Sequence, residues 1–214
     1  MTTPRHLHRL SLAAAALSLL ALMLAPALTP AAQAATIGEA APAFEAKDVG
    51  GKTVKLVDFK GRHVVLEWTH PGCPFVAKHY GTQNMQGLQK EFTAKNVVWL
   101  SISSTAPSNA DYLAPAALAA KYRAWGASAT ALLADDSGAV GQAYAAKTTP
   151  HLFVIDPKGT LVYAGGIDDK RSSEAADVKG AKNHVRAALN ESLAGKAVSV
   201  PSAPPYGCSV KYAS

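Results

Sequence analysis

Hydrophobic and polar positions change their spacing several times along the chain, and each spacing predicts a different element. Continuous apolar runs over residues 63–68 and 97–102 are typical of strands, and a third, shorter run covers residues 130–133. Near the beginning, apolar and polar residues alternate over residues 53–56 after a Gly-Gly turn, which predicts a small hairpin with the extended segment 37–46.

The last two predicted strands form a hairpin of their own. Residues 151–155 are an apolar run directly after Thr149-Pro150, and a Pro-Lys-Gly turn leads back into the apolar residues 161–164. Because so short a turn leaves no room for a crossover, these two strands are expected to be antiparallel.

Apolar residues at helical spacing follow the first long strand. Val76, Tyr80, Leu88 and Phe92 recur at this spacing up to about residue 96, and Gly81-Thr82 interrupts the pattern, which predicts a kink or a break. Further helices are predicted over residues 115–125, 140–146 and 181–193. Strands separated by helices, with a closing hairpin and a final helix, predict an α/β fold: a mixed β-sheet with helices on both faces. No internal repeat or second domain is evident.

The first 34 residues have the pattern of a secretory signal peptide. Arg5 and Arg9 precede an apolar run over residues 10–24, and Ala-Gln-Ala ends the segment as a small-x-small cleavage site. An uncleaved membrane anchor is the alternative, although the run is short for a span of about 20 residues. We therefore expect a secreted or periplasmic protein whose residues 35–214 form one domain with a cysteine-containing C-terminal tail.

The charge of the chain gives little indication of a partner. The formal net charge of +6 falls by two when Arg5 and Arg9 are removed. The remaining basic residues are scattered, without the runs or interleaved aromatic residues that nucleic-acid binding requires. We expect no nucleic-acid partner and no stable membrane span in the mature chain.

Cys73 lies where the first long strand gives way to a helix. A polar turn precedes it, and Pro74 suits the first helical position, so Cys73 is predicted to be the N-cap of the helix. The helix dipole at that position would stabilise a thiolate. The neighbours His70 and Lys78 favour an exposed, reactive sulfur, whereas the alternative is a small buried core residue.

Three motifs in sequence order carry a resemblance to a known family. They are Gly-Cys-Pro-Phe-Val at 72–76, Thr-Thr-Pro-His-Leu-Phe-Val-Ile-Asp at 148–156 and Gly-Cys-Ser-Val-Lys-Tyr at 207–212. With this order of elements, the chain resembles thioredoxin-fold redoxins, in particular the secreted peroxiredoxin-like proteins of the alkyl hydroperoxide reductase and thiol-specific antioxidant group. The resemblance covers nearly all of residues 35–214 and implies a thioredoxin-like fold and thiol-based chemistry.

The resemblance also assigns expected roles to individual residues. Pro150 would be a cis proline beside the active cysteine, and Glu67 would be a buried acid that transfers protons, unless it points to solvent or forms a salt bridge. A buried acid has a raised pKa, which suits a general base. Pro74, Thr149 and His70 would contact the substrate.

Two departures from the family pattern limit what the resemblance implies. Val76 stands at the second cysteine position of thioredoxins, so Cys73 has no resolving partner in its own turn. In the peroxidase pattern Pro-x-x-x-Thr-x-x-Cys, Leu66 and His70 replace the proline and the threonine, which disfavours rapid reduction of peroxides.

Cys208 is the other cysteine of the chain, and it follows a Pro-Pro-Tyr-Gly segment. In a mobile tail it could attack an oxidised Cys73 and act as its resolving thiol. Alternatively, the two cysteines form a static disulfide that contributes about 4 to 5 kcal/mol by closing a long loop, or they never meet. A copper site formed by His70, Cys73 and His79 is a further alternative, because thiolate and imidazole groups bind that metal.

These observations predict an exported thiol-dependent oxidoreductase with Cys73 as nucleophile and Cys208 as possible resolving thiol. Its partners would be protein thiols or disulfides, or a small hydroperoxide, with an unidentified electron donor and no cofactor. The alternatives are a hydroperoxide-reducing peroxidase and a non-enzymatic protein that binds copper or a client.

Overall fold

The computed structural model describes residues 34–213, so the predicted signal peptide lies outside the described residues except for Ala34. Within this range, one mixed sheet has the strand order β2-β1-β5-β4-β3-β7-β8-β9, and β6 and β10 form a separate two-stranded pair. The strands are β1 (Glu45–Asp48), β2 (Thr53–Lys55), β3 (Val64–Trp68), β4 (Val98–Ser103), β5 (Ala131–Ala134), β6 (Thr148–Thr149), β7 (His151–Ile155), β8 (Leu161–Gly165), β9 (Ser202–Ala203) and β10 (Cys208–Ser209).

The centre of the sheet combines parallel and antiparallel strands. β3 is parallel to β4 and antiparallel to β7, which in turn is antiparallel to β8. The predicted mixed sheet and its closing hairpin are therefore confirmed. The N-terminal hairpin of β1 and β2 also forms, and β1 adds to β5 in the antiparallel direction, which the sequence pattern did not predict.

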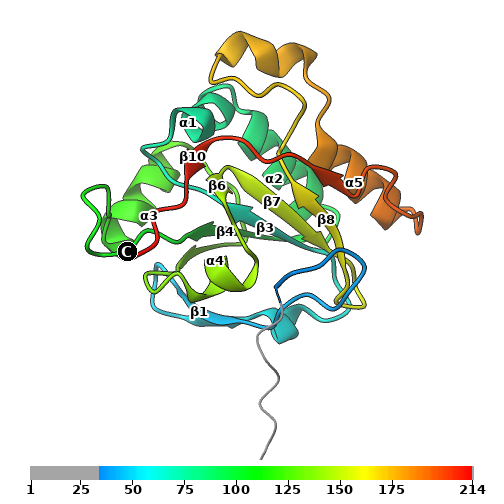
Figure 1. Ribbon diagram of the computed structural model, residues 1–214, viewed down its shortest axis with the longest axis horizontal. Coiled ribbons are helices and arrows are strands. Elements are labelled where there is room, and N and C mark those ends of the chain that lie inside the picture. Colours follow the sequence, from blue (N-terminus) through cyan, green and yellow to red (C-terminus); the bar gives the residue numbers. More distant parts are fainter. Residues whose placement is uncertain (1–33, 214) are drawn as a thin grey trace, which may run out of the picture. The chain divides into compact units, whose positions relative to one another are not determined.

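Two hydrophobic clusters cover the two faces of the sheet, as the sequence predicted. The helices are α1 (Pro74–Gly81), α2 (Asn84–Thr93), α3 (Pro115–Ala124), α4 (Ala139–Ala143) and α5 (His184–Leu193), with the short 3-10 helices η1 (Leu56–Phe59) and η2 (Ala175–Gly180). Residues of α1, α2, α3 and α5 pack on one face, and α4 packs with η1 on the other (Figure 1).

Alternation along β3 explains how this strand serves both clusters. Leu66 and Trp68 face the α4 side, whereas Val65 faces the side of α1 and α2. Glu67 shares the side of Val65, because side chains two residues apart lie on the same face of a strand. A carboxylate is thereby placed inside the larger of the two clusters.

The predicted interruption after α1 is a true break between two helices. α1 ends at Gly81, and Gln83 adopts a left-handed conformation with φ of 61° before α2 begins. α1 is consequently a short helix of eight residues whose N-terminus faces the carboxyl end of β3.

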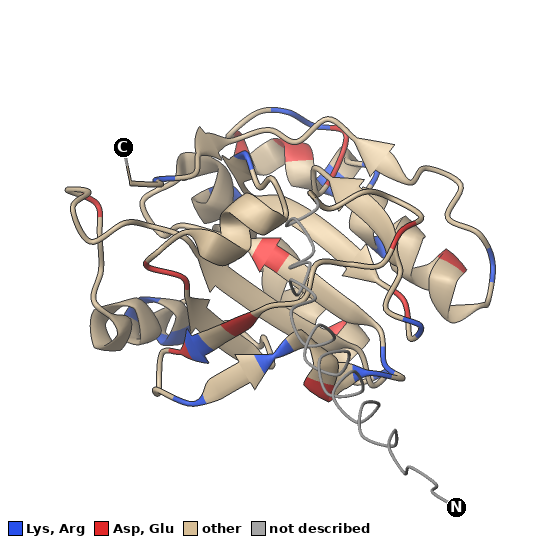
Figure 2. Ribbon diagram, turned by 60° about the horizontal axis from the view of Figure 1, so that its bottom comes forward, with Lys and Arg blue, Asp and Glu red and all other residues tan. Residues whose placement is uncertain are grey.

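Charged residues are dispersed over the described part of the chain. Figure 2 shows basic and acidic segments interspersed over strands, helices and loops, without a continuous basic surface. No helix among the described residues has the length and apolarity needed to cross a membrane.

Candidate redox site

The site is built around Cys73, which the structure places at the N-cap of α1 with Pro74 following in the first turn. Both features were predicted. The Cys73 side chain makes no capping hydrogen bond; its thiol instead donates to the carbonyl oxygen of Thr149 at 3.0 Å. The Thr149-Pro150 peptide bond is cis, as the resemblance implied.

The C-terminal tail brings the second cysteine to the same place. β10 pairs antiparallel with β6, and Cys208 is the register partner of Thr149. Both cysteines are free thiols, and the pairing places Cys208 beside Thr149, whose carbonyl oxygen accepts from the Cys73 thiol. Burial, followed by the neighbouring Cys73, raises the pKa of the Cys208 thiol well above its usual value. The two cysteines therefore lie near each other in the fold, and a reaction between them stays a prediction.

The prediction of an exposed Cys73 is also wrong. Its side chain is 1% exposed and belongs to the core cluster of α1 and α2. The paired strands β6 and β10 account for this burial, because the tail lies over the start of α1 (Figure 1). Lys78 does not face the sulfur either, since its ammonium group donates to the carbonyl oxygens of Lys170 and Ser172 at 2.9 and 3.0 Å.

The tail makes contacts on both sides of Cys208; the mobility that the sequence suggested stays a prediction. Before the cysteine, β9 pairs with β8 along the edge of the main sheet. After it, Val210 donates to the Lys147 carbonyl at 3.1 Å, and the Tyr212 hydroxyl donates to the Ala146 carbonyl at 2.8 Å. Cys208 is thus held in place by contacts with several elements.

Gly207 allows the closest approach of the tail to β6. A Cβ atom at this position would lie 2.0 Å from the Thr149 carbonyl oxygen, and φ is 136°, a conformation that side chains rarely adopt. The glycine before Cys208 is therefore required for the pairing of β10 with β6.

Replacing Gly207 by alanine is expected to open the site without unfolding the domain. The clash of the new Cβ with the Thr149 carbonyl oxygen disfavours the closed state, and a cost of about 1.4 kcal/mol or more would raise the open population, and with it the rate of Cys73 alkylation by iodoacetamide, at least about tenfold. Gly195→Ala is the control, because Gly195 also has a positive φ of 70° but no atom within 4 Å of the new Cβ. Equal alkylation rates in the two variants would contradict the assigned role of Gly207.

Glu67 is fully buried, as predicted from the resemblance, and four donors surround it. The hydroxyl of Tyr80 donates to one carboxylate oxygen at 2.8 Å. The other oxygen accepts from Trp99 at 2.7 Å, Ser101 at 2.9 Å and Gln89 at 3.1 Å. Burial raises the pKa of Glu67, and the four hydrogen bonds partly oppose this effect.

These contacts indicate a structural role for Glu67. Within residues 34–213 its hydrogen-bond partners are Tyr80, Gln89, Trp99 and Ser101, and neither cysteine is among them. Transfer of a proton between Glu67 and a cysteine stays a prediction.

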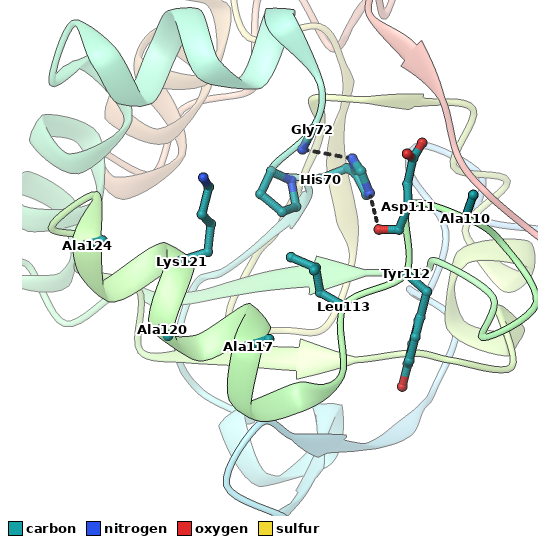
Figure 3. Close-up of a pocket in the computed structure, with 11 residues that line it drawn as sticks. His70, Gly72, Ala110, Asp111, Tyr112, Leu113, Ala117, Ala120, Lys121 and Ala124 are labelled. Carbon is teal, nitrogen blue, oxygen red and sulfur yellow. Dashed lines mark hydrogen bonds between the residues drawn. The ribbon is translucent and has the colours of Figure 1, made fainter.

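His70 closes the turn before Cys73. The Gly72 amide donates to Nδ1 at 3.1 Å, so Nε2 is the protonated nitrogen that donates to the Asp111 carbonyl at 3.3 Å. Beside this turn lies an open hollow of about 660 Å³ (Figure 3). Its walls are mostly small apolar side chains of the α3 segment, with Asp111 and Lys121 as the charged residues.

Thr149 contributes a second feature besides its carbonyl group. Its hydroxyl is buried and has no hydrogen-bond partner among residues 34–213. An unpaired buried hydroxyl is costly, and it is available to a group that enters the site.

The alternative copper ligands His70, Cys73 and His79 are not arranged as a metal site. His70 and His79 each use both ring nitrogens in hydrogen bonds within the protein. No group of three or more potential ligands within residues 34–213 is arranged to hold a metal ion.

Comparison with known proteins supports the fold, and a family model matches the part of the chain that contains Cys73 and Pro150. The family described as "AhpC/TSA family" matches residues 37–164, a range that includes Cys73 and Pro150 and ends before the tail with Cys208. A comparison with curated protein sequences found no match.

Similar solved structures come from several bacteria. A hypothetical protein from Sinorhizobium meliloti 1021 is 26% identical with a TM-score of 0.72, covering 85% of this chain and 97% of its own. An uncharacterized conserved protein from Geobacillus kaustophilus is 27% identical with a TM-score of 0.73, covering 83% and 93%. A putative thioredoxin from Neisseria meningitidis, 22% identical with a TM-score of 0.52, covers 72% and 92% and shows likeness in fold alone. The predicted thioredoxin-like fold is confirmed.

Proposed function

Because the chain belongs to the AhpC/TSA family of thioredoxin-fold redoxins, we propose that it is a thiol-dependent oxidoreductase in which Cys73 is the nucleophile and Cys208 the resolving thiol. The observation that carries this proposal is that the pairing of β6 with β10 places the free Cys208 beside Thr149, whose carbonyl oxygen accepts from the free Cys73 thiol at 3.0 Å. Thioredoxins have their second cysteine at the position of Val76. In this chain, Cys208 would provide the second thiol instead.

The first step is nucleophilic attack by the Cys73 thiolate on a substrate disulfide. A new bond forms between Cys73 and one substrate sulfur, and the other substrate sulfur leaves as a thiolate. Cys73 is the N-cap of α1, so its sulfur lies at the end of the helix where the backbone N–H groups are free. Because Cys73 is buried, the substrate reaches it only after local displacement of the tail.

The second step is attack by Cys208 on the sulfur of Cys73. This attack releases the second substrate thiol and leaves a disulfide between Cys73 and Cys208, so the substrate is reduced and the protein is oxidised by two electrons. Burial is the main cause of the raised pKa of Cys208, and the charge of a Cys73 thiolate adds to it. Formation of the mixed disulfide removes that charge, which lowers the pKa of Cys208 when its thiolate is needed.

A disulfide suits this site better than a peroxide. In the position of the peroxidase threonine, His70 has both ring nitrogens occupied by Gly72 and Asp111. Its ring therefore has no donor left for a peroxide oxygen. The backbone of β6 offers a docking edge to an extended peptide that carries a disulfide, once β10 leaves.

The proposed location follows from the N-terminal pattern. Removal of residues 1–34 by a signal peptidase would export the domain to an oxidising compartment, where dithiol–disulfide couples operate.

The proposed function is tested by the rates at which two oxidants consume the thiols of the reduced mature protein. Oxidised glutathione is expected to react at least about tenfold faster than it does with free cysteine, whereas hydrogen peroxide reacts at nearly the rate of free cysteine. The matched control is Cys73→Ser, which should lose the fast reaction. A fast reaction with peroxide alone would make the protein a peroxidase, and no enhancement with either would favour a binding protein.

A further inference from the structure

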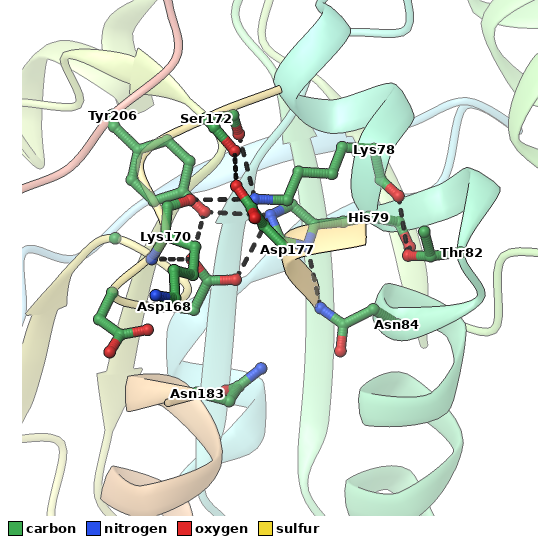
Figure 4. Close-up of polar contacts among 12 residues, drawn as sticks. Lys78, His79, Thr82, Asn84, Asp168, Lys170, Ser172, Asp177, Asn183 and Tyr206 are labelled. Atoms are coloured by element: carbon green, nitrogen blue, oxygen red, sulfur yellow. Dashed lines mark hydrogen bonds and ion pairs between the residues drawn. The ribbon is translucent and has the colours of Figure 1, made fainter. Parts of the chain in front are cut away.

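Two residues before Cys208, the tail carries a tyrosine that is held by a buried chain of hydrogen bonds. The Tyr206 hydroxyl donates to Oδ1 of Asp168 at 2.5 Å. Nε2 of His79 lies 3.2 Å from the same hydroxyl, and Nδ1 of His79 lies 2.9 Å from the side-chain nitrogen of Asn84 (Figure 4). These four residues, the Tyr206 clamp, come from α1, the start of α2, the loop after β8 and the tail.

The protonation of the Tyr206 clamp follows from its geometry. The Asn84 amide group donates to Nδ1 of His79, so Nε2 carries the proton and donates to the Tyr206 oxygen. Burial and the adjacent Lys78 lower the pKa of His79 to about 3, which keeps the ring neutral. Each donor of the clamp therefore has a defined acceptor: Asn84 donates to His79, His79 donates to Tyr206, and Tyr206 donates to the carboxylate of Asp168.

The clamp fixes the tail against the helix that carries Cys73. The ring of Tyr206 lies 6.0 Å from the ring of Phe75, edge to face, and 5.7 Å from the ammonium group of Lys78. Cys73 caps α1, and His79 lies near its end. Tyr206 therefore contacts α1 at Phe75 and His79. Two residues further on, Cys208 pairs with Thr149, whose carbonyl oxygen accepts from Cys73 at the N-cap of the same helix.

We propose that Tyr206 is the positioning residue for the resolving thiol, with Asp168 and His79 holding its hydroxyl. This inference rests on the proposed function of the Cys73–Cys208 pair. A slip of the tail by one residue would take Cys208 out of register with Thr149 and turn its side chain to the opposite side. The hydroxyl group of Tyr206 opposes that slip, since the slip would leave the buried Nε2 of His79 without its acceptor and remove the hydroxyl donor from the buried carboxylate of Asp168.

The test separates the two chemical steps with dithionitrobenzoate, a coloured aromatic disulfide. Cys73 attacks it and releases one nitrothiobenzoate; Cys208 then attacks Cys73 and releases the second, which leaves the protein disulfide. The second release is intramolecular, so its rate in the wild type is expected to be independent of reagent concentration.

In Tyr206→Phe the second release is expected to be about 10- to 100-fold slower, while the first release is not slowed, because misplacement affects only the attack by Cys208. Tyr144→Phe is the control, since it also removes one buried hydroxyl, which donates to the Pro42 carbonyl at 2.7 Å on the other face of the sheet. Asp168→Ala should resemble Tyr206→Phe, and Asp168→Asn, which keeps an acceptor oxygen, should restore the second rate to near the wild-type value.

Two outcomes would overturn different parts of the account. A second release in Tyr206→Phe within about twofold of the wild-type rate would overturn the positioning role alone. Equal slowing of both releases in that variant would also contradict it, because it would indicate a general loss of structure. A wild-type protein without a concentration-independent second release would instead contradict the proposed function.

Discussion

Cys73→Ser is expected to abolish the reduction of disulfide substrates, so that the remaining rate equals that of the uncatalysed exchange. A serine hydroxyl does not form the thiolate that attacks the substrate, and Val76 provides no second thiol in the turn. Cys208 does not substitute for Cys73, because its pKa is raised and it does not occupy the N-cap position of α1. Turnover of oxidised glutathione with a dithiol as reductant measures this loss.

Cys208→Ser is the matched variant, because it removes the other thiol by the same substitution. Its first step should proceed, and the mixed disulfide between Cys73 and the substrate should accumulate to about one equivalent per chain. Intact mass under non-reducing conditions detects the adduct. Loss of turnover in Cys208→Ser without an adduct, or an adduct in Cys73→Ser, would reverse the roles of the two cysteines.

Glu67→Ala is expected to lower the free energy of unfolding by about 3 to 5 kcal/mol, the largest stability effect that we predict. The substitution leaves the four buried donors of Tyr80, Gln89, Trp99 and Ser101 without their acceptor. Glu67→Gln should cost much less, because its amide oxygen still accepts from the donors on one side and the Tyr80 hydroxyl can accept from its NH₂ group. Urea unfolding of both variants measures these differences.

The pH dependence of stability gives Glu67 a signature of its own. Because burial raises the pKa in the folded state, the native protein binds this proton more tightly than the unfolded chain does. The contribution of Glu67 is therefore fully present below the unfolded pKa of about 4.5 and is lost as the pH rises through the raised folded value. As the pH rises over this range, the unfolding free energy of Glu67→Gln should therefore increase relative to that of the wild type. Parallel curves for the two proteins would contradict the raised pKa.

The elements that position Cys73 were predictable from the sequence because their signals are local. The apolar run of β3, the proline at the first position of α1 and the interruption at Gly81-Thr82 each act within a few residues. The closing hairpin was equally clear, since β7 and β8 are apolar and a tight turn joins them. Sequence reasoning therefore found the sheet, the N-cap and the Thr149-Pro150 segment.

The environment of the site was not predictable, because it depends on pairings between distant parts of the chain. β6 and β10 have two residues each, too few to show a period, and their pairing buries Cys73. His79 and Lys78 look like exposed helix residues until Tyr206 and the loop after β8 cover them. Gly207, whose role is steric, offered one signal that could have been used: a glycine directly before a cysteine in a proline-rich tail.

The most direct test of the account is the disulfide state of the wild-type protein after exposure to one equivalent of a disulfide oxidant. Alkylation of the remaining thiols, followed by proteolysis and mass spectrometry, identifies the bonded residues. The account predicts loss of both free thiols and one peptide pair that joins Cys73 to Cys208 within a single chain. A mixed disulfide that persists on Cys73 while Cys208 stays free, or a disulfide between two chains, would contradict it.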